Sequence, residues 1–172
     1  MLYDLLKICV SIFFNVLNKF LGGKLPPFGS ACALVEKDGR YLVVELPRGR
    51  IVFPGGFMTW NEQPQQTAER EGREETGLQL HVLELINVYS APSRRITQLS
   101  TVSFAYRAEV VGGELRKNIE GRPHWLSESE LRQRMGPSAL RVLDDWLRKQ
   151  KKSPQLSEQT DTSCNFKQAE LT

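Results

Sequence analysis

The chain has 172 residues, of which 40% are hydrophobic and 25% charged, and a formal net charge of +3. This composition is ordinary for one globular domain, and it excludes a collagenous, a fully disordered and a polytopic membrane protein. A charge of this size does not indicate nucleic-acid binding, so no specific nucleic-acid partner is predicted. Three scattered cysteines without a CxxC pair indicate reduced thiols in a cytoplasmic protein.

The first predicted element is an amphipathic helix over residues 2–21 that is apolar around most of its circumference. Its polar residues recur at spacings of three and four and form one narrow stripe: Asp4, Lys7, Ser11, Asn15, Asn18 and Gly22. Charged and amide residues interrupt the segment too often for a simple transmembrane span. A secretory signal would begin with a positive region and end at a small-residue cleavage site, and neither is evident.

Two main interpretations of this helix stay open, with a poorly cleaved signal or a misjudged span as the lesser alternative. In the first interpretation, the wide apolar face packs against the domain or against a second subunit. In the second, residues 2–21 lie in a membrane interface and make the protein peripheral to the membrane.

A linker over residues 22–28 follows, because Gly22-Gly23 stops a helix and Pro26-Pro27 cannot continue it. Strands are predicted over 31–35, 41–46, 51–53, 80–89, 101–111 and 124–126, and helices over 64–75, from residue 127 and over 137–149. The polar segment 151–172 predicts a disordered tail. The expected units are therefore 1–27, 28–150 and 151–172, with α/β layers around a mixed sheet in the middle unit.

Three carboxylates share one face of the predicted helix over 64–75. Glu71, Glu74 and Glu75 are spaced three, four and one apart, and like charges three or four apart destabilise a helix by roughly 0.2–0.5 kcal/mol per pair. A divalent hard cation reverses the sign of that interaction, since Mg²⁺ prefers oxygen ligands and bridges to phosphates. The alternative is a merely solvated acidic helix.

The spacing around these residues resembles the box of the Nudix hydrolase family. The matching positions are Gly56, Glu62, Arg70-Glu71, Glu74-Glu75 and Gly77-Leu78, and Phe53-Pro54-Gly55 is similar to the usual lead-in. Gly72 departs from the pattern, because the family has an aliphatic residue there. We expect this glycine to lower helix propensity by about 0.8–1 kcal/mol and to lose some packing. The resemblance implies a Nudix-type α/β/α sandwich with a mixed sheet, preceded here by the N-terminal amphipathic helix.

The family's activity implies hydrolysis of the phosphoanhydride in a nucleoside diphosphate linked to another group, with Mg²⁺ or Mn²⁺ as cofactor. By resemblance, the metal ligands are the carbonyl of one glycine and three carboxylates: Gly56, Glu71, Glu74 and Glu75. Glu71 and Glu74 are catalytic together with Arg70, which pairs with a box carboxylate, whereas Glu62 and Gly77 are structural. Metal-assisted phosphoryl chemistry of this kind depends on positioning and electrostatic stabilisation.

The general base is a box glutamate or a glutamate on a later loop. Glu120, five residues before Trp125, resembles the family's loop glutamate and is the candidate. An exposed loop acid without a catalytic role is the alternative.

Few residues in the sequence indicate which substrate is bound. Pro92 lies 15 residues beyond Gly77, which is similar to ADP-ribose and ADP-sugar hydrolases. The candidate substrate-binding residues are Arg48, Arg50, Trp60, Arg94 and Arg95. The alternatives are a (d)NTP or other nucleotide pyrophosphatase, a non-catalytic nucleotide-binding domain and a membrane-associated scaffold. A homodimer is expected because dimers are common among soluble oligomers.

Overall fold

The computed structural model describes residues 2–47, 49–117 and 121–168. Its elements, in chain order, are α1 (Leu2–Phe20), β1 (Phe28–Lys37), β2 (Arg40–Glu45), β3 (Ile51–Val52), β4 (Gly55–Phe57), α2 (Pro64–Thr76), β5 (Leu78–Ala91), β6 (Thr101–Gly113), β7 (Arg122–Ser127), α3 (Glu128–Arg134) and α4 (Pro137–Gln168). One strand is predicted over 51–53, whereas the structure has two short strands, β3 and β4, because a Pro-Gly step interrupts the run.

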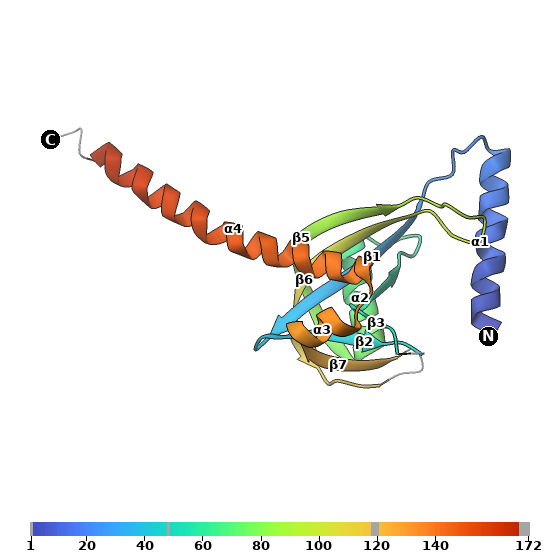
Figure 1. Ribbon diagram of the computed structural model, residues 1–172, viewed down its shortest axis with the longest axis horizontal. Helices are drawn as coiled ribbons and strands as arrows, with labels where there is room; N and C mark the ends of the chain where they lie inside the picture. The colour runs from blue at the N-terminus through green and yellow to red at the C-terminus, as the bar shows by residue number, and fades with distance from the viewer. Residues whose placement is uncertain (1, 48, 118–120, 169–172) are drawn as a thin grey trace.

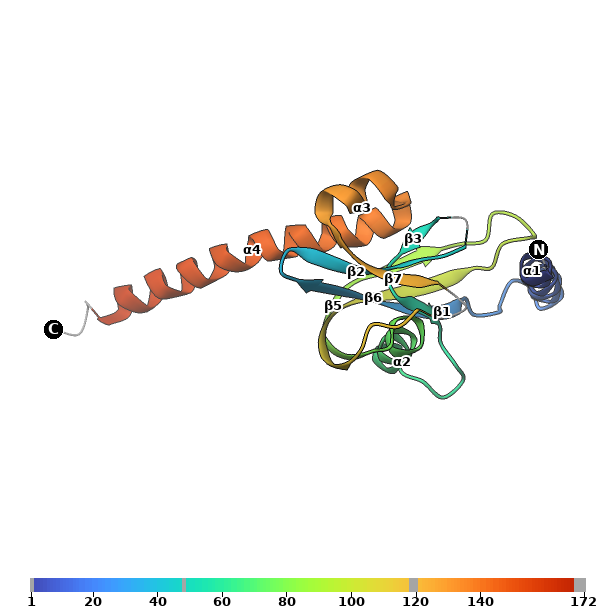
Figure 2. The ribbon, with the colours of Figure 1, turned by 90° about the horizontal axis from the view of Figure 1, so that it is seen from below.

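Within the described residues, seven strands form one mixed sheet (Figure 1). The strand order is β3-β2-β1-β6-β5, with β4 paired to β1 and β7 paired to β2. β1 and β6 are parallel, whereas the other pairs are antiparallel. Helix α2 covers one face of the sheet, and α3 and the start of α4 cover the other (Figure 2). The predicted α/β/α sandwich with a mixed sheet is therefore confirmed.

The alternation of β1 between the two faces explains the two apolar cores. Leu34 packs on the side of α3 and α4, in a cluster with Leu131, Leu143 and Trp146. Its neighbour Val35 points to the other side and packs in a cluster with Ala68 of α2. Side chains of successive strand residues point to opposite faces, so a strand covered by helices on both sides is apolar at nearly every position.

Gly72 brings α2 close to β5. A Cβ at Gly72 would lie 2.3 Å from Leu80 Cδ1, and Leu80 is a buried side chain. The expectation that this glycine loses packing is therefore wrong, because Leu80 fills the space that an aliphatic side chain would take.

We expect Gly72→Ala to lower the free energy of unfolding by about 1 kcal/mol. Overpacking against Leu80 costs about 1–3 kcal/mol, which exceeds the gain of about 1 kcal/mol in helix propensity. Urea unfolding measures the difference. Gly72→Ala combined with Leu80→Val is expected to recover most of the loss, and a single Gly72→Ala variant that is more stable than the parent would contradict this account of the packing.

Helix α1 lies at the edge of the body with its polar stripe turned inward. Ser11 is only 6% exposed, and Asn15 Nδ2 donates to the carbonyl oxygens of Ile96 and Gln98 in the loop between β5 and β6. The apolar residues of the outer side remain exposed, among them Phe13 at 61% and Phe20 at 85%. The interpretation that the apolar face packs against its own domain is therefore wrong, since the side of α1 that faces the body carries Ser11 and Asn15.

Helix α4 is longer than expected. The sequence predicts a helix end at residue 149 and a disordered tail from residue 151, whereas the structure continues the helix to Gln168. The added segment contains Pro154, which has no backbone N–H to donate, but the other residues added to an existing helix can each gain one backbone hydrogen bond. Figure 1 shows α4 leaving the body along a straight path.

Candidate active site

The local sequence sets where α2 begins and ends. Pro64 occupies the first turn, where its missing N–H is not needed, and the backbone N–H of Gln63 donates to Gln66 Oε1 at 2.8 Å. At the other end Gly77 adopts the left-handed conformation, with φ of 78°, and its N–H donates to the carbonyl oxygen of Arg73. These ends place the carboxylates of the helix beside the turn between β4 and α2.

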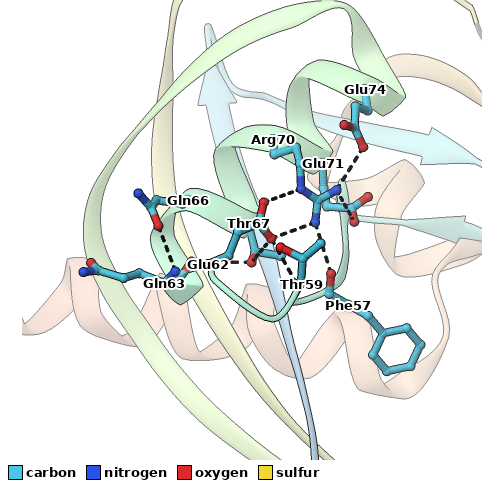
Figure 3. Close-up of polar contacts among 9 residues, drawn as sticks. All are labelled: Phe57, Thr59, Glu62, Gln63, Gln66, Thr67, Arg70, Glu71 and Glu74. Atoms are coloured by element: carbon cyan, nitrogen blue, oxygen red, sulfur yellow. Dashed lines mark hydrogen bonds and ion pairs between the residues drawn. The ribbon is translucent and has the colours of Figure 1, made fainter.

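Arg70 lies at the centre of the site and contacts three carboxylates (Figure 3). Its Nε lies 2.6 Å from Glu62 Oε1, and its Nη1 lies 2.8 Å from Glu71 Oε1 and 2.9 Å from Glu74 Oε2. Nη2 donates to Glu62 Oε2 and to the carbonyl oxygen of Phe57, both at 3.1 Å. The planar guanidinium therefore binds Glu62 in a bidentate fashion and neutralises part of the acidic face of α2.

Glu62 accepts hydrogen bonds from three residues around it. Besides Arg70, it accepts hydrogen bonds from Thr67 Oγ1 at 2.9 Å and from the backbone N–H of Thr59 at 3.1 Å. The Arg70 guanidinium and these donors lower the pKa of Glu62 from 4.5 to about 2. In return, the hydrogen bond with Glu62 raises the pKa of Arg70 above its ordinary value, which keeps the guanidinium charged. Thr59 and Thr67 were not expected from the sequence, although Thr67 lies one helical turn beyond the start of α2.

We expect Glu62 to contribute to the acid sensitivity of the fold. Because its pKa is lower in the folded protein, its stabilisation is complete above pH 4.5 and is lost as the pH falls through about 2. That shift corresponds to a contribution of about 3 kcal/mol. Chemical unfolding from pH 7 to pH 2 should show Glu62→Gln less stable than the parent at neutral pH and equal to it near pH 2. A stability difference that does not change with pH would contradict the role of the Glu62 charge.

Two consecutive glycines let strand β4 lie against the acidic face of α2. A Cβ at Gly56 would lie 2.4 Å from Glu71 Oε1, and a Cβ at Gly55 would lie 2.4 Å from the carbonyl oxygen of Ala31. The backbone N–H of Gly55 donates to Glu75 Oε2 at 2.9 Å, and Glu75 is 6% exposed. No side chain larger than hydrogen fits at either position, so these glycines let β4 approach the carboxylates of Glu71 and Glu75.

The predicted metal ligands therefore lie together at one end of α2: Gly56, Glu71, Glu74 and Glu75. Their donors are oxygens, which suit Mg²⁺ or Mn²⁺ in chemistry. Among the described residues, no group of three or more Asp, Glu, His or Cys side chains is arranged to hold a metal ion. In this arrangement Arg70 Nη1 contacts both Glu71 and Glu74. The four predicted ligands fit a divalent cation in donor type and charge. In this structure the Arg70 guanidinium supplies the positive charge between Glu71 and Glu74.

The structure separates the other predicted residues from this cluster or leaves them undescribed. Glu120 and Arg48 lie outside the described residues. Trp60 belongs to the turn before α2 and is 99% exposed, and Arg50 is exposed before β3. Arg94 and Arg95 are exposed on the loop between β5 and β6, the same loop that binds α1 through Asn15.

Comparisons with known proteins agree with this fold and site. The family model described as "NUDIX domain" matches residues 26–147. A "MutT-like protein" of Streptomyces ambofaciens is 34% identical over 125 residues, which cover 69% of this chain and 78% of that protein. An "ADP-ribose pyrophosphatase" of Methanocaldococcus jannaschii is 31% identical over 102 residues, which cover 57% of this chain and 60% of that protein. A solved "NUDIX hydrolase" from Nitrosomonas europaea has a TM-score of 0.65 and 25% identity, over 72% of this chain and 90% of its own.

Proposed function

The chain belongs to the Nudix family and is a hydrolase of phosphoanhydrides, and from this premise we propose that it uses Mg²⁺ or Mn²⁺ to cleave a nucleoside diphosphate linked to another group. The single observation that carries the proposal is the acidic face of α2, where Arg70 contacts Glu71 and Glu74, and where Glu71 and Glu75 lie against Gly56 and Gly55 of β4. All the box carboxylates remain, whereas a domain that only binds nucleotides has no need for a face that repels itself.

In the proposed mechanism, Glu71, Glu74, Glu75 and the carbonyl of Gly56 hold the cation. A divalent cation bound there supplies neutralisation of phosphate charge and a lowered pKa for a bound water. Arg70 orients Glu71 and Glu74 through its charge-assisted hydrogen bonds.

Two further groups of the chain have proposed parts in the reaction. Glu75 fixes the turn by accepting the hydrogen bond from the N–H of Gly55, so that the turn cannot drift from the helix. We propose Glu120 as the general base that takes a proton from the attacking water.

For the substrate, we propose ADP-ribose or an ADP-sugar. Two observations support this choice: the placement of Pro92 after the box, and the similarity to a protein named as an ADP-ribose pyrophosphatase. Trp60 is almost fully exposed, so its ring is available to stack on a base. Arg48, Arg50, Arg94 and Arg95 remain candidates for contact with phosphate. The similarity to a MutT-like protein supports a nucleoside triphosphate pyrophosphatase as the second candidate.

Three other expectations stay predictions. The division into residues 1–27, 28–150 and 151–172 is supported by the family match over residues 26–147. A cytoplasmic location is supported by the scattered cysteines, of which Cys9 and Cys32 are free thiols in the described structure. A homodimer remains an expectation based on how common dimers are.

The deciding experiment is hydrolysis of a nucleotide panel by the full chain, with and without Mg²⁺ or Mn²⁺. The panel holds ADP-ribose, ADP-sugars, UDP-sugars, dinucleoside polyphosphates, NADH and the (d)NTPs, with phosphate released by a coupled phosphatase or pyrophosphatase. We expect metal-dependent turnover that is highest for ADP-ribose or an ADP-sugar. Preferred turnover of (d)NTPs would replace the substrate proposal with the second candidate. A folded, metal-binding protein without turnover across the panel would favour a binding role.

A further inference from the structure

Helix α1 presents an inside-out arrangement for a surface helix. A helix on a soluble domain normally buries its apolar face and exposes its polar face. Here the hydrogen bonds of Asn15 to the loop between β5 and β6, and that of Asn18 Oδ1 from the N–H of Leu25, use the polar stripe to attach the helix. The side turned away from the protein carries large exposed apolar residues: Leu6, Phe13, Val16 and Phe20.

The attachment of α1 to the body is specific. The ring of Phe14 meets that of Phe28 edge to face at 4.7 Å between centroids, and Phe28 meets Phe57 at 6.2 Å. Phe57 is the residue whose carbonyl oxygen accepts a hydrogen bond from Arg70. Ring contacts therefore connect α1 to Phe57 of β4, beside the candidate active site. These contacts lie on the inner side of α1 and hold its exposed apolar side outward.

Apart from Asp4 near its start, α1 and the loop that it contacts carry only positive charges. No aspartate or glutamate occurs in residues 5–35 or in residues 85–108. Lys19 and Lys24 are exposed at the end of the helix and in the linker, and Arg94 and Arg95 are exposed on the loop that binds Asn15. Ile96 of the same loop is 54% exposed, which extends the apolar area beside these cations.

We propose that α1 and the loop between β5 and β6 form one docking surface, the α1 surface, for an anionic lipid bilayer. An apolar helix side beside lysines and arginines is typical of a helix that lies in the headgroup region, where apolar burial and attraction to anionic lipid act together. Within the described residues, no helix is long and apolar enough to cross a bilayer, so α1 would lie along the surface.

A second copy of the chain fits the α1 surface less well than a bilayer does. In a twofold dimer the same patch meets itself, and Asp4 is the one carboxylate in the sequence of α1 and the loop between β5 and β6 to set against Lys19, Lys24 and the loop arginines of both copies. The exposed apolar residues also extend around about 200° of the helix, wider than the roughly 100° stripe that a packed helix needs. A lipid interface can surround such a wide face, and anionic headgroups would neutralise the cations.

Vesicle flotation of the full chain tests the proposal. We expect the protein to float with vesicles of phosphatidylcholine containing about one third phosphatidylglycerol, and to float far less with pure phosphatidylcholine or at high salt. Phe13→Asn with Phe20→Asn should weaken binding to anionic vesicles about tenfold or more, because two exposed rings no longer insert. Lys19→Gln and Lys24→Gln should each weaken it about fivefold.

Matched controls separate the α1 surface from general stickiness. Val111 and Leu115 are exposed apolar residues at the far end of β6 and in the segment after it, 59% and 42% exposed, so Val111→Asn with Leu115→Asn should bind vesicles as the parent does. The Phe13 and Phe20 variant should keep the parent's unfolding temperature and hydrolysis of soluble substrate. Absence of flotation with both vesicle types would overturn the proposal. So would a lipid-free dimer in sedimentation velocity that the Phe13 and Phe20 variant dissociates, since that result would assign the α1 surface to a second copy.

Discussion

Glu74→Gln is expected to lower the metal-dependent kcat by about 10²–10³-fold while the fold stays intact. The substitution keeps the length and a hydrogen-bond acceptor but removes one negative charge from the proposed cation site, and weaker binding of the cation would lessen its stabilisation of the reacting phosphate, an effect of about this size. Because the Glu74 side chain is 51% exposed, its pairing with Arg70 contributes little to stability. Steady-state kinetics across a Mg²⁺ titration measures the effect, with thermal unfolding as the check on the fold.

Glu69→Gln is the matched control on the same helix. Glu69 accepts a hydrogen bond from the backbone N–H of Val82 at 2.9 Å, away from the Arg70 cluster, and a glutamine oxygen can accept the same bond. We therefore expect Glu69→Gln to retain the parent kcat. Unchanged turnover in Glu74→Gln, or an equal loss in both variants, would remove Glu74 from the proposed metal site.

Arg70→Ala is expected to lower the free energy of unfolding by about 2 kcal/mol in metal-free buffer. The guanidinium is 22% exposed and contacts Glu62, Glu71 and Glu74, so its removal leaves three carboxylates close together without a cation. Added Mg²⁺ should raise the unfolding temperature of Arg70→Ala more than that of the parent, because a divalent cation would replace the missing charge. Activity should fall as well, since the orientation of Glu71 and Glu74 depends on the guanidinium.

Two further variants serve as controls for Arg70→Ala. Arg73→Ala removes an exposed arginine of α2 outside the cluster, and we expect a change within about 0.5 kcal/mol. Arg70→Lys keeps the charge but cannot reproduce the bidentate contact with Glu62, so its stability should lie between those of Arg70→Ala and the parent. An equal response of the parent and Arg70→Ala to Mg²⁺ would contradict the idea that metal and guanidinium neutralise the same carboxylates.

The Nudix box and the two ends of α2 could be predicted from local sequence. Pro64 at the start and Gly77 at the end are signals that act within one turn of the chain, so their effect is independent of the rest of the fold. The shared face of Glu71, Glu74 and Glu75 follows from helical periodicity in the same way. The Nudix resemblance and the enzyme class depended on these short-range features, whereas the mixed sheet was predicted from strand segments with interspersed helices, and the structure and the comparisons confirm all three.

Contacts between distant segments could not be read from spacing. The sequence offers no sign that Leu80 fills the space beside Gly72, or that Phe57 contributes its carbonyl oxygen to Arg70. The predicted end of α4 at residue 149 was too early, because composition reports mean polarity whereas helix propagation depends on the helix already formed.

By itself, the sequence determined the family, the identity of the acidic cluster and the existence of an apolar first helix, because each is encoded within a few turns of chain. Only the tertiary structure decided which side of α1 faces the protein. The amides of Asn15 and Asn18 find backbone partners in the loop between β5 and β6 and in the linker, and these hydrogen bonds hold a helix whose apolar side remains outside. That choice depends on where the loop between β5 and β6 and the linker lie in space, which no local pattern specifies.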